Sequence, residues 1–317
     1  MASMLRESRL TGDNISVVIP SYNHGNYIES AVMSVIDQTV KNVEIVIVDD
    51  GSTDNSTTIC KKLSRQHAQV KLFTQTNQGA HNAINYGVNL AKGEFIAVLN
   101  SDDLFERSKI EQCIDALNSN RNLEFVVGGA VLFIDEKGRI QNNGVSTEWH
   151  RRAVDFFDES GSLGLSLLNE NFVVTTSNMV FSKRFWKEAA GFKSLRYCHD
   201  LEFLLEATRN TTVHVCRDNP QIRYRVHSQN TIKEDISKVR VEIASVVAQA
   251  ICESGCALIG ENSARNIQLF RKFLRNKNIS DLVLFLIMKY LDAANNRSYY
   301  EDIFQDENKI GYSVLLD

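Results

Sequence analysis

Residues 95–109 read FIAVLNSDDLFERSK, and this change from apolar to acidic residues decides the fold. Residues 95–99 are apolar, which is typical of a strand covered on both faces. The strand is followed by four polar residues, Asn100, Ser101, Asp102 and Asp103. Two neighbouring carboxylates repel each other unless a positive group lies beside them. The sequence therefore predicts a buried strand whose carboxyl end needs a positive partner.

Strands and helices alternate along the first 130 residues. Strands are expected at 15–20, 43–50, 70–75, 94–100 and 123–134, and helices at 26–39, 55–67, 79–90 and 107–118. This alternation predicts an α/β fold with a mostly parallel sheet and helices on both faces. Ligands of such sheets bind at the carboxyl ends of the strands.

Three strand ends carry polar or acidic groups. They read PSYN (20–23), DDGSTD (49–54) and NSDD (100–103). The glycine-rich fingerprints GxGxxG and GxxxxGK[ST] are absent from the sequence, so these loops do not cradle phosphates in the usual way. Acidic strand ends that hold a divalent cation offer another means of binding a diphosphate.

Composition excludes several classes of protein. The 317 residues are 43% hydrophobic and 23% charged, with a formal net charge of -4, so a basic nucleic-acid binder is not indicated. None of the six cysteines forms a CxxC pair, which argues against a structural zinc site. We find neither a signal peptide nor an apolar run long enough to span a membrane, and we expect a cytoplasmic protein.

The alternation stops near residue 135. The polar stretch 136–160 is expected to be a loop-like insertion, and 177–192 a strand, a short helix and a turn at Gly191. Further elements are expected to be a helix at 199–209, strands at 212–216 and 222–227, and helices from about 237 to 300, with breaks near Gly255 and Gly260 and at 276–278. The predicted organisation is a flexible N-terminus (1–13), an α/β domain (14–230) and a C-terminal helical region (231–317).

Five segments together resemble the family 2 glycosyltransferases. They are SVVIPSYNHGNYIESAVMSVIDQT, EIVIVDDGSTDNS, NQGAHNAINYGVNLAKGEFIAVLNSDD, SNMVFSKRFWKEAAGF and HDLEF. They occur in the family's order and cover roughly residues 15–230. The resemblance implies a GT-A fold, which is a Rossmann-like nucleotide-binding fold, and an inverting transfer of sugar from a nucleotide-sugar.

The resemblance also implies the donor-binding residues. Pro20 and Tyr22 match the loop that holds the nucleotide base, and Asp50 matches the carboxylate that accepts a hydrogen bond from a uracil-type imide. Asn100 and Ser101 occupy the first two positions of the family's DxD motif. The sequence departs from the commoner form there, because Asn100 replaces an aspartate, although an amide can still bond a ribose hydroxyl.

The metal and catalytic residues follow in the same way. Asp102 matches the carboxylate that binds Mn²⁺ or Mg²⁺, and this ion is the expected positive partner of the acidic pair. His227 matches a histidine near the metal or the phosphates. Asp200 matches the catalytic base, which takes a proton from the acceptor hydroxyl, although His199 stands where the family has an acidic residue.

Each of these residues also has a purely structural interpretation. Asp50 and Asp102 fit turn formers after a strand, and Asp200 fits a helix N-cap. Tyr22 fits core packing, and His227 fits a structural histidine. The motif set as a whole favours the functional interpretation.

The resemblance implies a UDP-sugar as the favoured donor and a glycan or lipid-linked acceptor, as in bacterial surface polysaccharide or lipopolysaccharide assembly. Two other functions stay open at this point. A nucleotidyltransferase that makes nucleotide-sugars would show a glycine-rich basic signature near its first strand, which IPSYNHGNY lacks. A non-catalytic nucleotide-sugar-binding module would not need Asp200.

The C-terminal region mixes basic and apolar residues. Segment 264–291 contains Arg271, Lys272 and Arg275 beside the apolar run LVLFLIM at 282–288. We expect this region to expose a contact surface. The two alternatives are a homo-oligomer interface, which the apolar run favours, and peripheral contact with the inner face of a membrane.

Overall fold

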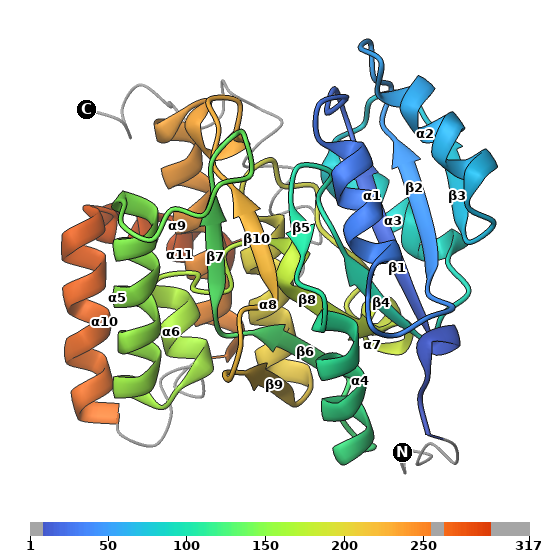
Figure 1. Ribbon diagram of the computed structural model, residues 1–317. Coiled ribbons are helices and arrows are strands. Elements are labelled where there is room, and N and C mark those ends of the chain that lie inside the picture. Colours follow the sequence, from blue (N-terminus) through green and yellow to red (C-terminus); the bar gives the residue numbers. More distant parts are fainter. Residues whose placement is uncertain (1–8, 255–262, 293–317) are drawn as a thin grey trace. The chain divides into compact units, whose positions relative to one another are not determined.

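The computed structural model describes residues 9–254 and 263–292 (Figure 1). Within these residues the chain forms two compact units. The sheet unit comprises 9–154, 173–192 and 210–227, and the helical unit comprises 155–172, 193–209, 228–254 and 263–292. Segments of the two units thus alternate along the chain from residue 155 onward. The domains 14–230 and 231–317 stay a prediction.

A seven-stranded sheet in the order β3-β2-β1-β4-β8-β6-β9 forms the centre of the sheet unit. Its strands are β1 (Ile15–Ser21), β2 (Glu44–Asp49), β3 (Val70–Thr74), β4 (Phe95–Val98), β6 (Phe125–Gly128), β8 (Met179–Ser182) and β9 (Val213–Cys216). Strands β1 to β4 are parallel, and β8 is antiparallel to β4 and β6. Every residue of the interior strand β1 is buried, as its mostly apolar sequence requires. The predicted, mostly parallel α/β fold is confirmed.

The prediction of one strand over 123–134 is wrong. The segment forms β6 and then β7 (Val131–Ile134), which belong to different sheets. Strand β7 joins a second, three-stranded sheet with β10 (Ile222–Arg225) and β5 (Leu104–Phe105). The chain changes sheet at two glycines, and the amide of Gly129 donates to the carbonyl of Cys216 at 2.7 Å. A Cβ on Gly128 would lie 2.3 Å from Oδ1 of Asn178, so only glycine fits there.

The helices predicted for the N-terminal half are present. They are α1 (Ile28–Ile36), α2 (Ser56–Gln66), α3 (Ala80–Leu90) and α4 (Lys109–Ser119), with α7 (Lys183–Glu188) after β8 and short 3-10 turns at Gly12–Asn14 and Thr176–Asn178. Helix α3 packs on β1 and β2 through the bare backbone of Gly87, where a Cβ would lie 2.4 Å from Cγ1 of Val18. The predicted turn at Gly191 is also present, with a φ of 73°.

The prediction of a loop over 136–160 is wrong as well, because helix α5 (Val145–Ser160) occupies most of this stretch. Trp149, Ala153 and Phe157 recur at intervals of four residues, which places them on one face of a helix. Ala153 and Phe157 are buried. The charged residues between these three conceal the helical period in a simple inspection of polarity.

The helical unit contains most of the remaining helices. They are α6 (Leu163–Asn169), α8 (His199–Asn210), a 3-10 turn at Thr231–Lys233, α9 (Ile236–Ser254), α10 (Ser263–Lys277) and α11 (Ser280–Asp292). The predicted C-terminal helices and the break at 276–278 are confirmed within the described residues, and Asn278 takes a φ of 51° between α10 and α11. The predicted break near Gly255 and Gly260 lies outside the described residues.

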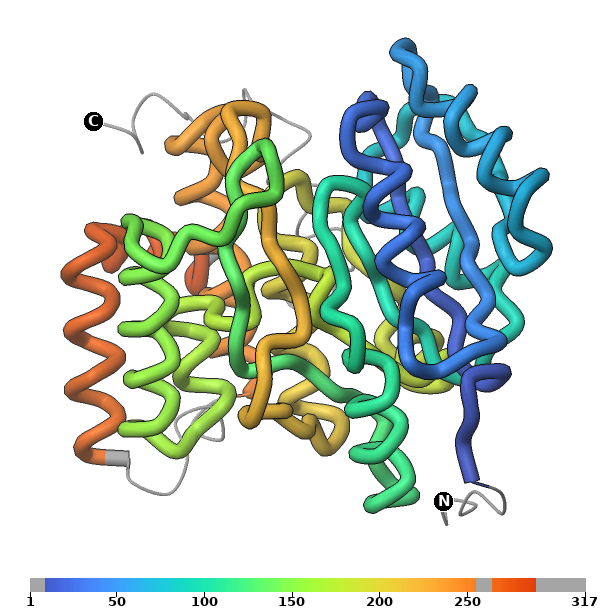
Figure 2. Tube along the Cα trace, viewed as in Figure 1, coloured from blue at the N-terminus to red at the C-terminus, as the bar shows by residue number. Residues whose placement is uncertain are grey.

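Long-range packing within this unit joins segments far apart in sequence. Helix α11 packs against α9, and α10 packs against α6. Figure 2 follows the same trace, with α10 at its left edge. Lys277 at the end of α10 pairs with Glu170 at 2.9 Å, and Arg265 pairs with Glu159 at 2.6 Å. Among the described helices we find none with the length and apolar character needed to cross a membrane.

The close approach at Gly128 gives a stability prediction. Gly128→Ala should destabilise the protein by roughly 1–3 kcal/mol, because the new methyl group has no space beside Asn178. Urea denaturation measures the change. Gly144→Ala is the matched control, since its Cβ would meet nothing closer than 3.8 Å. Equal stability of the two variants would contradict the assigned close contact.

Candidate functional site

The three polar strand ends lie side by side, as the sequence predicts. Strand β1 lies between β2 and β4 in the sheet, and Ser21 pairs in register with Asp49. The amide of Leu99 donates to the carbonyl of Val18 at 3.0 Å, which keeps the chain beside β1 up to the acidic segment. The carboxyl edge of the parallel strands therefore collects the polar groups of all three loops.

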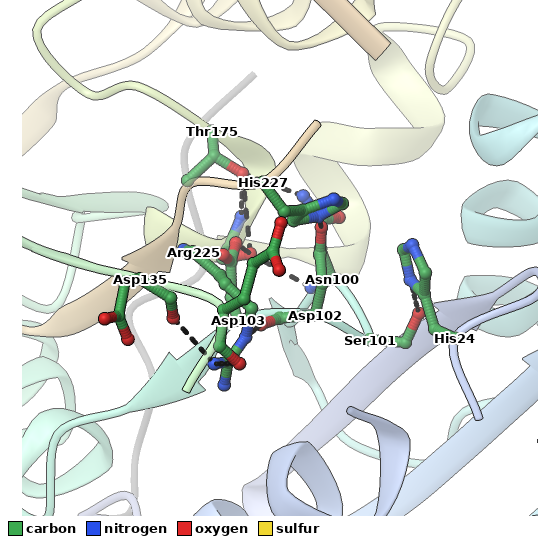
Figure 3. A network of polar contacts seen from close by, with 11 residues as sticks. His24, Asn100, Ser101, Asp102, Asp103, Asp135, Thr175, Arg225 and His227 are labelled. Carbon is green, nitrogen blue, oxygen red and sulfur yellow. Dashed lines mark hydrogen bonds and ion pairs between the residues drawn. The ribbon is translucent and has the colours of Figure 1, made fainter. Parts of the chain in front are cut away.

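Three side chains at this edge could share one metal ion. The ligand atoms of His24, Asp102 and His227 all lie within 4.8 Å of one another (Figure 3). His24 follows β1, Asp102 follows β4, and His227 follows β10. Nε2 of His227 lies 3.0 Å from Oδ2 of Asp102. A divalent cation would take the place of the proton shared there, so one carboxylate and two imidazoles fit such an ion.

The pKa of Asp102 is lower than usual for an aspartate. Burial alone would raise it, but the hydrogen bond with His227 and the nearby charges of His24 and His227 outweigh burial. Ser101, which is buried, bonds the other side of the cluster, with its Oγ 2.7 Å from Nδ1 of His24. Asp102 is therefore held ready as an anion.

Asp103 is in the opposite electrostatic state. It is fully buried, and burial together with the charge of Asp102 raises its pKa well above the usual value. Its Oδ2 accepts a hydrogen bond from Oγ of Ser177 at 2.6 Å, and its Oδ1 accepts from the amide of Arg225 at 3.0 Å. Asp103 thus fixes the loop, while Asp102 faces the histidines.

A buried arginine supplies positive charge beside the acidic pair. Nε of Arg225 donates to the carbonyl of Asp102 at 2.8 Å, and its guanidinium also reaches the carbonyls of Asp135 and Glu136 (Figure 3). The guanidinium carbon lies 4.7 Å from the centre of the Tyr27 ring. The guanidinium of Arg225 therefore supplies part of the positive charge that the sequence predicts beside Asp102 and Asp103.

Asn100 is tied to the segment before β8. Its Nδ2 donates to Oγ1 of Thr175 at 2.8 Å, and its Oδ1 accepts from Oγ1 of Thr176 at 3.0 Å. Its backbone amide donates to Oγ of Ser177 at 2.9 Å. Since an amide has two donors and two acceptor lone pairs, one of each is left at Asn100 for a ligand.

Asp50 organises the loop between β3 and α3. Its Oδ1 accepts from Nε2 of Gln75 and from the amide of Gln78, both at 2.8 Å, and its Oδ2 accepts from the amide of Gly79 at 2.9 Å. Gly79 has a φ of 89°, a conformation that favours glycine. A carboxylate offers about four acceptor positions, so Oδ2 of Asp50 keeps capacity for one more donor.

The ends of β1 and β2 carry two buried polar atoms without a hydrogen-bond partner, Oγ of Ser21 and Oδ1 of Asp49. The other oxygen of Asp49 accepts from Oγ1 of Thr57 at 3.0 Å and from the amide of Ser52, so Asp49 steadies its loop. Pro20 is buried within β1, whereas Tyr22 is 45% exposed and does not fill the core.

Asp200 lies in the first turn of α8, in the helical unit. Its Oδ2 accepts from Nδ2 of Asn171 at 2.9 Å, and its Oδ1 accepts from the amide of Leu201 at 2.7 Å. Burial raises the pKa of Asp200 to about 7, and the charge of Glu242 adds to this, against the lowering effect of the hydrogen bonds. A carboxyl with this pKa exchanges its proton near neutral pH.

Sequence reasoning missed three contributors to these sites. His24 lies in the segment NHGN, which looks like a turn, and its only signal was its position after a strand that carries a predicted binding loop. Arg225 alternates with apolar residues in a strand, which is typical of an exposed position. Asn171 follows a helix end, and nothing local relates it to Asp200.

Comparison with known proteins agrees with this architecture. A family model described as "Glycosyl transferase family 2" matches residues 16–185. An uncharacterized glycosyltransferase of Rickettsia conorii is 40% identical over 124 residues, which cover 39% of this chain and 20% of that protein. The chondroitin synthase of Escherichia coli is 27% identical over 271 residues, which cover 84% of this chain and 37% of that protein. The chain thus spans well under half the length of both.

Solved structures share the fold. TarS 1–349 of S. aureus, solved in complex with UDP-GlcNAc, has a TM-score of 0.61 at 20% identity and covers 96% of this chain and 82% of its own. The mannosyltransferase PcManGT of Pyrobaculum calidifontis, solved with GDP-Man and Mn²⁺, has a TM-score of 0.53 at 14% identity, with 95% and 86% covered. At these identities the likeness supports the GT-A fold alone.

The raised pKa of Asp200 gives a pH-dependent stability prediction. An unfolded aspartate ionises near pH 3.8, and the folded one near pH 7, so the folded state binds the extra proton between these values. Stability therefore falls as the pH rises from about 4 through 7. Asp200→Asn removes this loss, which we expect to be on the order of 1–3 kcal/mol after allowing for the partial exposure of the side chain.

Urea denaturation at pH 5 and pH 8 measures this effect. Asp200→Asn should gain stability relative to the parent on going to pH 8. Glu202→Gln on the same helix should also gain stability relative to the parent at pH 8, because burial raises the pKa of Glu202 to about 7. A parent and an Asp200→Asn variant with the same dependence on pH would contradict the raised pKa.

Proposed function

Because the chain belongs to glycosyl transferase family 2, we propose that it moves a sugar from a nucleoside-diphosphate sugar to a hydroxyl group, with inversion at the anomeric carbon. The observation that carries the proposal is the cluster of His24, Asp102 and His227 at the carboxyl edge of the parallel strands. This edge is where sheets of this kind bind their ligands.

The metal proposed for this cluster is Mn²⁺ or Mg²⁺. A divalent ion, when bound, would offset the negative charge of the departing diphosphate. Asp102 would contribute a carboxylate oxygen, and His24 and His227 would contribute ring nitrogens. Imidazole is a better ligand for transition metals than for Mg²⁺, so two histidines favour Mn²⁺. The Mn²⁺ in the PcManGT complex supports this choice.

The donor-binding roles rest on the loops around that cluster. We assign the nucleotide base to the loop with Pro20 and Tyr22, whose exposed ring offers a face for stacking. The remaining acceptor position of Asp50 suits the imide N–H of uracil. Asn100 and Ser101 are assigned to the ribose and the adjoining phosphate. UDP is the favoured nucleotide, and the UDP-GlcNAc complex of TarS supports it.

Asp200 is the proposed catalytic base. The acceptor oxygen forms a bond to the anomeric carbon while the bond from that carbon to the diphosphate oxygen breaks. The acceptor's proton passes to a carboxylate oxygen of Asp200. With a pKa of about 7, a large share of Asp200 is ionised at neutral pH, and the ionised carboxylate is basic enough to accept a proton. A pKa near the working pH gives a general base the best balance of ionised fraction and basicity.

The acceptor is proposed to be a glycan or a lipid-linked sugar, in the assembly of a bacterial surface polysaccharide. The relative named chondroitin synthase supports a glycan acceptor. We also propose that the protein works in the cytoplasm and that its C-terminal helices contact a second copy or the inner face of the membrane.

A donor screen tests the proposal as a whole. Release of nucleoside diphosphate is measured with UDP-, GDP- and CDP-sugars in the presence of Mn²⁺, together with the thermal shift that each donor causes. A UDP-sugar should give both the highest rate and the largest shift. Preference for a guanine or cytosine nucleotide would contradict the role of Asp50, and no hydrolysis or transfer with any donor would contradict the activity.

The metal cluster gives its own prediction. His24→Gln should weaken Mn²⁺ binding by roughly tenfold or more, since even groups that only support a ligand often contribute that much. Titration followed by electron paramagnetic resonance measures this without reference to activity. His214→Gln, at an exposed position of β9, is the control and should bind like the parent. Unchanged binding in His24→Gln, or full parental activity in EDTA, would contradict the proposed ligand set.

The base is tested by turnover. Asp200→Asn should lower kcat by about 10²-fold or more, because it cannot accept the proton, and should keep donor affinity. Glu202→Gln removes another buried carboxyl of α8 and should keep parental kcat. Calorimetry measures the affinity. If Asp200→Asn lost donor binding, Asp200 would be a donor ligand and not the base.

A further inference from the structure

The carboxylate of Glu242 is unusual for a helix side chain. It lies on α9, is only 4% exposed, and accepts three backbone hydrogen bonds from one short segment. Its Oε1 accepts from the amide of Arg196 at 2.8 Å. Its Oε2 accepts from the amides of Tyr197 and Cys198, at 2.7 and 3.0 Å. Hydrogen bonds to a charged acceptor are stronger than neutral ones, so this is a firm attachment.

The segment that Glu242 holds leads directly into α8. Cys198 immediately precedes His199, the first residue of the helix, and Asp200 is the second. Arg209 at the other end of α8 pairs with Glu253, also on α9. Helix α9 thus fixes α8 at both ends, and Glu242 fixes the end that carries Asp200.

Glu242 also acts on Asp200 through charge. Glu242 and Cys198 are titratable side chains that interact electrostatically with Asp200, and His199 is its neighbour in the chain. Glu242 has like charge and raises the pKa of Asp200, whereas Asn171 lowers it by hydrogen bonding. The two partners therefore have opposing influences on the same carboxylate.

We propose that Glu242 is a positioning residue for Asp200: it fixes the 196–198 segment and the first turn of α8 to α9, and it acts on Asp200 through its charge. The proposal rests on the role of Asp200 given under the proposed function. It adds a residue of helix α9 to the surroundings of Asp200, and both residues lie past the part of the chain matched by the family model, which ends at 185.

Two substitutions separate the two effects. Glu242→Gln keeps the size and removes the charge, and it should lower the pKa of Asp200 by about 0.5 unit or more, because a nearby like charge raises a carboxyl pKa. Glu242→Asp keeps the charge but is one methylene shorter. It should leave that pKa nearly unchanged and lower kcat by roughly ten- to hundredfold, because Asp200 moves from its productive position.

The pKa is read from the carboxyl carbon-13 signal of Asp200 in the full chain, assigned by its loss in Asp200→Asn. This readout needs no donor or acceptor. Hydrogen exchange at the amides of Arg196, Tyr197 and Cys198 should accelerate in Glu242→Asp. The control is Glu234→Gln, which removes a carboxylate that binds the exposed guanidinium of Arg196 at 2.7 Å and should leave both measurements as in the parent.

Kinetics completes the test, with the donor that gives the highest rate in the screen and Mn²⁺ present. The KM for the donor should stay the same in Glu242→Asp while kcat falls. An unchanged kcat and unchanged amide exchange in Glu242→Asp would overturn the proposal, even if Glu242→Gln did not fold. So would a pKa of Asp200 that stays the same in a folded Glu242→Gln. If the parent protein showed no activity with any donor, that result would instead count against the proposed function.

Discussion

Two adjacent carboxyl groups, whose pKa values are shifted in opposite directions, organise the carboxyl edge of the sheet. Asp103 is buried, and its pKa is raised by burial and by Asp102. It bonds the hydroxyl of Ser177 and the backbone of Arg225, so it connects β4 to β10 and to the segment before β8. Asp102 is left to bear the charge that the two histidines stabilise. If both carboxylates were ionised without partners, their repulsion would push this edge apart.

In the helical unit, the carboxyl group of Asp200 has different surroundings. Asp200 has no histidine or arginine among the hydrogen-bond partners given by the structure, and burial brings its pKa to about 7. The pKa values of these two carboxyl groups are thus shifted in opposite directions, that of Asp102 downward and that of Asp200 upward. The proposed sugar transfer uses both groups, because Asp102 would hold a cation throughout the reaction while Asp200 takes a proton from the acceptor. The positioning role proposed for Glu242 adds a residue of the C-terminal helices to this arrangement.

The sequence alone predicted the parallel strands β1 to β4 and most of the polar residues at their carboxyl edge. Apolar runs followed by polar loops predicted β1, β2 and β4 and their adjacent ends. Asp102 and His227 lie 3.0 Å apart, and their role as metal ligands stays a prediction. The roles of Tyr22, Asp50 and Asn100 stay predictions. Asp50 and Asn100 both have structural hydrogen bonds in addition.

What sequence reasoning missed depends on long-range contacts. Helix α5 was hidden because charged residues interrupt its apolar face, and β6 and β7 look like one strand until β8 and β10 select different partners. His24, Asn171 and Glu242 are single polar residues in ordinary local contexts. Each becomes significant only through a partner distant in the sequence, since Glu242 lies 44 residues beyond the amide of Cys198.

The proposed chemistry depends on a divalent cation held by His24, Asp102 and His227 at the edge of the sheet. The most direct test is an anomalous-diffraction experiment at the manganese absorption edge, on crystals of the full chain grown with Mn²⁺ and UDP. We expect one strong peak within bonding distance of Asp102 and both imidazoles, next to the diphosphate of the bound UDP. A peak elsewhere, or UDP bound with no metal at these three residues, would contradict it.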